Sequence, residues 1–192
     1  PLRAHSENLA GNEVLSYNPD KAKELWAQAD AIAPWDGTFE IAYNSDGGHK
    51  EWVEATTNSI KNTLGISAQA EPWTSRKELR TAAVDGTIDS PYGSEWPPDY
   101  PHIENYLTQR FASNGGYNEF GSEPQVDDLL ARAAASTDED QAVARYQEAE
   151  EILLDDLPQI PLVANVAAVS SMALTHAAFT YSNYPLYAAL EK

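Results

Sequence analysis

The amino-acid sequence predicts an α/β domain with a central, mostly parallel mixed sheet flanked by helices. The first observation is periodicity, because segments with apolar residues at helical spacing alternate with short segments rich in strand formers. Strands that alternate with helices in this way form parallel sheets covered by helices. The second observation is length, since 192 residues allow one domain or a domain and a half with its own core.

The first third of the chain predicts two helix–strand pairs. A helix begins at Asn18, which is followed by a proline suited to the first helical position, and ends before Pro34. Residues 38–43 alternate as a strand, 53–64 form a second helix that stops at a glycine, and 66–70 form a second short strand. Residues 1–17 show no periodicity and are predicted to be loop.

The middle of the chain predicts one more helix–strand pair, followed by an ordered loop and a further helix. Capping-box spacing at Ser75 begins a helix, and Thr87–Tyr92 is the expected third strand. Residues 93–101 form an ordered loop with proline-flanked aromatic residues, and a helix follows over 103–111. The pair Gly115-Gly116 marks a mobile loop.

The last third predicts two helices and then strands. One helix is capped within residues 122–125, and a longer one is capped by Thr137 and ends at Pro158. Ile160, Leu162 and the run Val166–Leu174 are predicted strands.

Composition excludes several classes of function. Thirty acidic residues against twelve basic ones give a net charge of −18, which repels phosphate backbones and anionic lipid headgroups. Nucleic acid is therefore not an expected partner, and cationic or amine-bearing ligands are favoured, although simple solubility also explains the charge. The chain has no cysteine, so disulfides, thiolate catalysis and cysteine zinc sites are excluded.

The motifs of known chemistries are absent, so no cofactor or metal is expected. Neither Gly-rich phosphate-binding pattern occurs, and the four histidines lie far apart in the sequence. Ser94 stands in Y-G-S-E-W, which is half of a G-x-S-x-G nucleophile motif, but no base is tied to it by spacing. A hydrolase using Ser94 or a carboxylate pair stays an alternative without support from spacing.

One segment is typical of a binding site, namely E-W-P-P-D-Y-P over residues 95–101. Trp96 and Tyr100 offer flat apolar faces on a rigid loop, and Asp99 offers a fixed negative charge for an ammonium group. The alternative is structural: Asp99 caps the helix that begins near Pro101 and Trp96 fills the core.

At this segment the sequence resembles the family 5 extracellular solute-binding proteins of peptide ABC importers, which have the type II periplasmic-binding fold. Four blocks match that family in order, and together they extend over nearly the whole chain. They are Y-N-P-D-K-A-K-E-L (17–25), W-P-P-D-Y-P with N-Y-L (96–107), P-Q-V-D-D-L-L (124–130) and R-Y-Q-E-A-E-E-I-L ending in L-P-Q-I-P-L (145–162).

The resemblance implies that the chain is the C-terminal lobe of a two-lobed protein that is not an enzyme. Residues 1–17 would be a linker from the missing first lobe, 18–164 the ligand-binding lobe, and 165–192 crossing strands and tail. The implied partners are a peptide ligand, the membrane permease and the missing N-terminal lobe. The implied location is extracellular or periplasmic, with a lipid anchor on the missing N-terminus. The lobe alone would bind peptide very weakly.

The resemblance also implies ligand contacts. Asp99 would take the free α-amino group of a peptide, and Trp96 would stack along it; Tyr100 and Asn105 are weaker candidates, for which packing and capping are equal alternatives. The same fold binding an oligosaccharide, a nickel chelate or haem is the second hypothesis. Exposed strand edges near Ile160–Leu174 would allow two copies of the fragment to pair.

Overall fold

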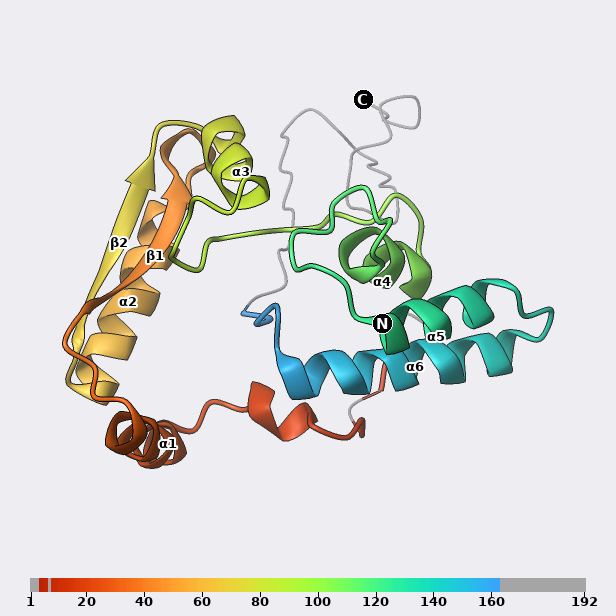
Figure 1. Ribbon diagram of the computed structural model, residues 1–192, viewed down its shortest axis with the longest axis horizontal. Coiled ribbons are helices and arrows are strands. Elements are labelled where there is room, and N and C mark those ends of the chain that lie inside the picture. Colours follow the sequence, from red (N-terminus) through yellow and green to blue (C-terminus); the bar gives the residue numbers. More distant parts are fainter. Residues whose placement is uncertain (1–3, 7, 163–192) are drawn as a thin grey trace, which may run out of the picture. The chain divides into compact units, whose positions relative to one another are not determined.

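The computed structural model describes residues 4–6 and 8–162, and these divide into two compact units (Figure 1). Residues 17–95 form one, here called the strand unit. The described residues up to 16 and residues 96–162 form the other, here called the helix unit. The predicted domain boundaries at residues 17 and 164 stay predictions.

The strand unit begins with α1 (Pro19–Ile32), whose first turn is closed by Asn18. The Asn18 side chain accepts a hydrogen bond from the backbone N–H of Lys21, as the Asn-Pro pair predicts. Helix α1 has no buried residue, although its apolar side chains lie at helical spacing. The predicted helix is therefore confirmed, but its apolar stripe stays largely outside the core.

The sheet of the strand unit consists, among the described residues, of β1 (Thr38–Asn44) and β2 (Ser67–Trp73), which pair in parallel. A short 3-10 turn, η2 (Ser45–Gly47), and α2 (Lys50–Leu64) connect them, and α3 (Arg76–Val84) follows β2. Apolar residues of β1 and α2 form the core of this unit. They are Ile41, Tyr43 and Val53, with Phe39, Trp52, Ile60 and Ala70 packed against them.

The predicted strand Thr87–Tyr92 is wrong for most of its length. Only Tyr92 makes a bridge to β1, opposite Ala42, with Ala42 donating to the carbonyl of Pro91 and Gly93 donating to that of Ala42. Asp89 and Pro91 lie in this segment, and these residue types are depleted in strands because Asp favours turns and Pro lacks a backbone donor.

The helix unit consists of η1 (Asn12–Leu15), α4 (Ile103–Phe111), α5 (Pro124–Ala134) and α6 (Glu139–Asp156). Helices α5 and α6 run side by side, and α4 packs against both (Figure 1). Their apolar faces close over one core. Its buried members are Ala4, Ile103, Leu107, Ala112, Val126, Leu130, Ala133, Ala142, Tyr146 and Ala149.

Three details of the helix unit differ from the sequence predictions. Residues 12–15 are a 3-10 helix, not loop, and α6 is capped by Asp138, whose side chain accepts from the N–H of Gln141, not by Thr137. Ile160 and Leu162 are not in a strand. The predicted strand Val166–Leu174 and the remaining tail lie outside the described residues, as does most of the edge predicted to pair between copies.

Candidate ligand-binding site

The proline-rich segment predicted as a binding site leads directly into α4 in the helix unit. The N-cap of α4 is His102, whose Nδ1 accepts a hydrogen bond from the backbone N–H of Glu104 at 3.1 Å. The same imidazole lies edge-on to Tyr146 of α6, with ring centroids 5.7 Å apart. The interpretation of Asp99 as the cap of this helix is therefore wrong, because His102 has that role.

The buried side chain of Asn105 on α4 holds the segment in place. It is 1% exposed, and its Oδ1 accepts two hydrogen bonds, from the indole Nε1 of Trp96 at 3.1 Å and from the backbone N of Asp99 at 2.9 Å. Its Nδ2 lies 3.5 Å from Oδ2 of Asp99. Three of the four predicted site residues therefore lie together, because Asn105 binds both Trp96 and Asp99. These contacts use the Asn105 side chain to hold the loop in position.

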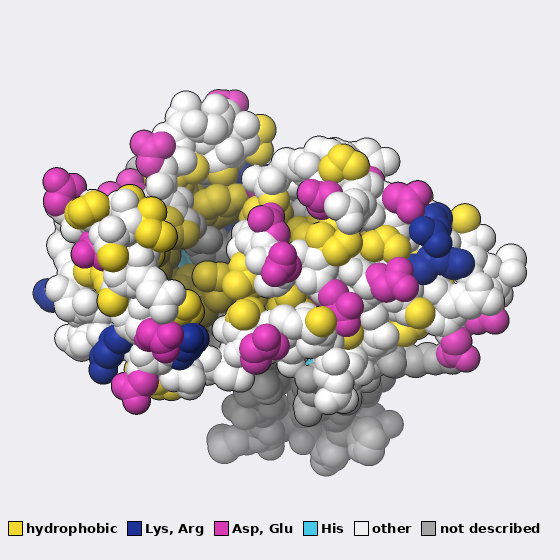
Figure 2. All heavy atoms as spheres, turned by 60° about the horizontal axis from the view of Figure 1, so that its bottom comes forward, with side chains coloured by type: hydrophobic (Ala, Val, Ile, Leu, Met, Phe, Trp, Pro, Cys, Tyr) yellow, Lys and Arg dark blue, Asp and Glu magenta, His cyan; other side chains and the backbone are white. Residues whose placement is uncertain are grey.

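The Asp99 carboxylate is exposed, although its backbone is fixed. Beside it, the Tyr100 hydroxyl donates to Oε2 of Glu104 at 2.7 Å, and this hydrogen bond together with partial burial raises the pKa of Tyr100. Acidic side chains are also scattered over the face drawn in Figure 2, where basic ones are few. A fixed carboxylate among further acids attracts a cation and repels an anion.

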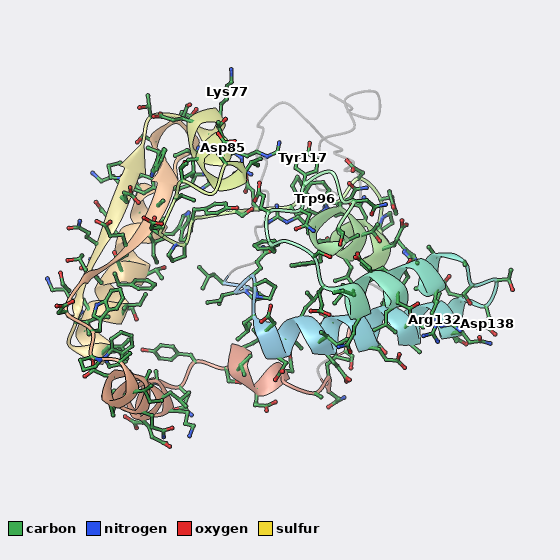
Figure 3. The ribbon with its side chains drawn as sticks, viewed as in Figure 1. Lys77, Asp85, Trp96, Tyr117, Arg132 and Asp138 are labelled. Carbon is green, nitrogen blue, oxygen red and sulfur yellow. The ribbon has the colours of Figure 1, made fainter. Side chains whose placement is uncertain are left out.

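Trp96 does not fill the core, since it is only partly buried. Its ring lies against that of Tyr117, which comes from the loop after α4 (Figure 3). Sequence reasoning missed both Tyr117 and His102. The only sequence signal for Tyr117 is an aromatic residue next to a Gly-Gly pair, and nothing in the spacing connects it to Trp96.

The part of the chain that the structure describes contains neither a metal centre nor a membrane span. Within residues 4–6 and 8–162, no group of three or more His, Asp or Glu side chains is placed to hold a metal ion. In the same part of the chain, no helix combines the length and apolar character needed to cross a bilayer.

The strand unit has a hollow of its own, of about 420 Å³, on the face of the sheet that carries Glu40 and Glu71. Trp35, Trp73 and Asp89 also line it, and Ser90 donates to Glu71 at 2.7 Å. It contains none of the four predicted ligand contacts.

Comparison with known proteins identifies the class. The chain is 29% identical over 155 residues to the probable D,D-dipeptide-binding periplasmic protein DdpA of Escherichia coli K12, covering 78% of this chain and 29% of that protein. It is 27% identical over 151 residues to the periplasmic oligopeptide-binding protein OppA of Salmonella typhimurium, covering 78% and 27%. The solved structure of OppA from Burkholderia pseudomallei superposes with a TM-score of 0.65 at 26% identity, covering 75% and 28%. No family model matches the chain.

These likenesses confirm that the fold is that of the periplasmic binding proteins. The resemblance to the family 5 solute-binding proteins is therefore supported by relatives that are named as periplasmic peptide-binding proteins. It spans less than a third of the length of the curated relatives it matches. These relatives are named as binding proteins of the periplasm and not as enzymes.

Proposed function

We propose that this chain is the C-terminal lobe of the substrate-binding component of a peptide ABC importer, and that it has no catalytic activity. The observation that carries the proposal is the exposed carboxylate of Asp99, held by buried Asn105 beside the indole of Trp96. The names of the homologues, which bind dipeptides and oligopeptides, support the same ligand class.

In this proposal the ammonium group of a peptide N-terminus binds Asp99. A charge-assisted hydrogen bond is stronger than a neutral one and needs no contact with a side chain, so it sets the register of peptides of any sequence. Trp96 packs along the peptide with its ring held by Asn105. Tyr100, with its hydroxyl on Glu104, flanks the ammonium position, and Asn105 acts by fixing the loop.

The rest of the surface that contacts the peptide would belong to a second lobe, because ligand-binding pockets usually bury most of the surface of their ligand. In this chain, residues 18–164 would form the C-terminal lobe, residues 1–17 a linker from the other lobe, and residues 165–192 the crossing strands. The whole protein would close on the peptide, dock on a permease and be anchored outside the membrane by an N-terminal lipid. A coding sequence without an upstream lipobox would contradict the lipid anchor, and one without a preceding lobe would contradict the two-lobed arrangement.

The ammonium site is testable on this chain by NMR. Titration of the ¹⁵N-labelled chain with Ala-Ala-Ala should shift amide signals of residues 96–105, with a Kd weaker than about 1 mM because half of the site is absent. N-acetyl-Ala-Ala-Ala, which lacks the ammonium group, should leave these signals in place. Asp99→Asn should weaken Ala-Ala-Ala binding by at least roughly tenfold, the effect of losing one charge-assisted hydrogen bond.

The matched control is Asp155→Asn, which makes the same charge change at an exposed position on α6. Equal effects of the two variants would mean that only net charge matters and would overturn the Asp99 site. Shifts that are identical for the acetylated peptide would also overturn it and favour another solute, such as an oligosaccharide or a metal chelate. Micromolar binding would contradict the proposal that this lobe carries only half of the site.

A further inference from the structure

Trp96 has a second aromatic residue beside it, and this pair is the feature of the helix unit that the proposed function leaves unexplained. The ring centroids of Trp96 and Tyr117 lie 4.8 Å apart with an interplanar angle of 59°. Tyr117 is 42% exposed and Trp96 is partly exposed, so both rings keep surface open to solvent. Figure 3 shows the two side chains meeting from the loops on either side of α4.

The pair is fixed relative to Asp99. The indole of Trp96 and the backbone of Asp99 donate to the same oxygen atom, Oδ1 of Asn105. The distance between the indole edge and the start of the Asp99 side chain is therefore set by one buried atom. This shared acceptor places the Trp96 ring and the Asp99 residue next to each other, so a ligand ammonium on Asp99 would lie in the neighbourhood of the aromatic pair.

The Tyr117 side is fixed by its own loop, which the sequence marks as mobile. The backbone N of Tyr117 donates to the carbonyl of Gln109 at 3.1 Å, and the side-chain Nδ2 of Asn118 donates to the carbonyls of Ala112 and Gly121 at 2.8 and 2.7 Å. Gly115 passes so close to α4 that a Cβ there would lie 2.6 Å from the carbonyl oxygen of Gln109, so a larger residue would displace the loop.

The loop after α4 is held against this helix by a buried ion pair and a cation–π contact. The side chains of Arg110 and Glu119 are 3% and 4% exposed, and their Nη1 and Oε2 atoms lie 3.9 Å apart. The guanidinium of Arg110 also lies 5.3 Å from the ring centroid of Phe120, a cation–π distance. Breaking a buried pair leaves an uncompensated charge, which favours a single position of the loop.

We propose that the Trp96–Tyr117 pair is a selectivity element for the group next to the ligand ammonium, with Tyr117 as a specificity-determining residue. The inference rests on the proposed function, since it concerns the same ligand. The class of ligand is a peptide whose first side chain is apolar or aromatic, because the open ring surfaces bury such a group. An acidic first side chain is disfavoured by Asp99 and by the negative field of the chain.

The test compares Phe-Ala-Ala, Ala-Ala-Ala and Asp-Ala-Ala in NMR titrations of the ¹⁵N-labelled chain. The unchanged chain should bind Phe-Ala-Ala roughly threefold to tenfold more tightly than Ala-Ala-Ala, the range that one aromatic contact provides. Asp-Ala-Ala should bind more weakly than either. Tyr117→Leu, which keeps apolar bulk without a π face, should lower the Phe/Ala ratio towards one, whereas Tyr117→Phe should retain the ratio.

The control is Tyr17→Leu, which removes an 82% exposed tyrosine from the strand unit. Slow solvent exchange of the Trp96 indole N–H reports whether Asn105 still holds that ring, and this protection should be kept in Tyr117→Leu. An unchanged Phe/Ala ratio in Tyr117→Leu, while Asp99→Asn still weakens all three peptides, would overturn the role of Tyr117 alone. Binding that is insensitive to Asp99→Asn would overturn the proposed function, and this inference with it.

Discussion

The helix unit and the strand unit bury their apolar residues to different extents. In the helix unit, α4, α5 and α6 close over ten buried residues, with Tyr146 as the largest. In the strand unit the buried cluster between β1 and α2 has three members, Ala42, Leu79 and Ala82 are buried outside it, and α1 contributes none. Leu25 and Ile32 on α1 are 52% and 87% exposed.

This difference in packing affects which unit can hold the side chains of a binding site in fixed positions. A two-stranded sheet is marginal by itself and depends on the helices packed against it, whereas three packed helices form a core of their own. The four predicted ligand contacts and Tyr117 all lie in the helix unit. The proposed site therefore lies in the unit with the larger buried cluster, as a preorganised site requires. If this comparison holds, substitutions in one core should leave amide protection in the other core largely intact.

The largest effect is expected for Tyr146→Ala, because Tyr146 is 2% exposed and is the largest buried side chain of the helix-unit core. The loss of a large buried aromatic side chain should lower the free energy of unfolding of the helix unit by about 4 kcal/mol. Urea denaturation followed by circular dichroism measures it. Tyr146→Phe is the control and should cost less than about 1.5 kcal/mol. A cost below that of the control would mean that α6 does not support the core.

Val53→Ala addresses the other core. Val53 is fully buried on α2 beneath β1, and shortening it should cost roughly 2 kcal/mol. Hydrogen exchange should accelerate for amides of β1 and β2 and not for those of α5 and α6. Val84→Ala makes the same change at a 65% exposed position on α3 and should have little effect. Equal acceleration in both units would show that they unfold together and would break the comparison.

A smaller and more local effect is expected at the start of α3. The Ser75 side chain accepts from the backbone N–H of Glu78 at 3.3 Å, so Ser75→Ala should cost about 1 kcal/mol and speed exchange of the first α3 amides. Ser75→Asp, which keeps an acceptor at the helix start, should restore protection. Faster exchange in α4 instead would contradict separate units.

The smallest effect concerns Glu150 on α6. Burial raises the pKa of this carboxyl above its usual value, with His5 opposing the shift. The native state therefore binds the proton more tightly than the unfolded chain, and stability falls as pH rises from the ordinary towards the raised pKa. At pH 7, Glu150→Gln should be more stable than the unchanged chain by less than about 1 kcal/mol, and at pH 3 the two should agree.

The control for this pH dependence is Glu148→Gln, an exposed neighbour on the same helix. Thermal unfolding at pH 3, 5 and 7 separates the two variants. A stabilisation by Glu150→Gln that is the same at all three values would indicate a packing effect and not the titration of this group.

Whether a secondary-structure prediction was confirmed depended on how far apart in the sequence the interacting residues lie. The helices over residues 19–32, 50–64, 76–84 and 103–111 follow the predictions, because periodicity and caps such as Asn18 and Ser75 act within one or two turns. The strand predicted at Thr87–Tyr92 failed because strand formation needs a partner in register, and only Tyr92 finds one. The cap of α6 was placed one residue early, at Thr137, where two adjacent polar residues compete for the role.

The sequence by itself determined the α/β class, the family resemblance and the position of Trp96 and Asp99 on a rigid loop, since these depend on local pattern and composition. Only the tertiary structure decided that Asn105 holds both residues through one oxygen atom, that His102 and not Asp99 caps α4, and that Tyr117 meets Trp96. The physical reason is that these contacts join separate segments through side chains whose direction is set by the packing of α4 and by the loop folded back onto it.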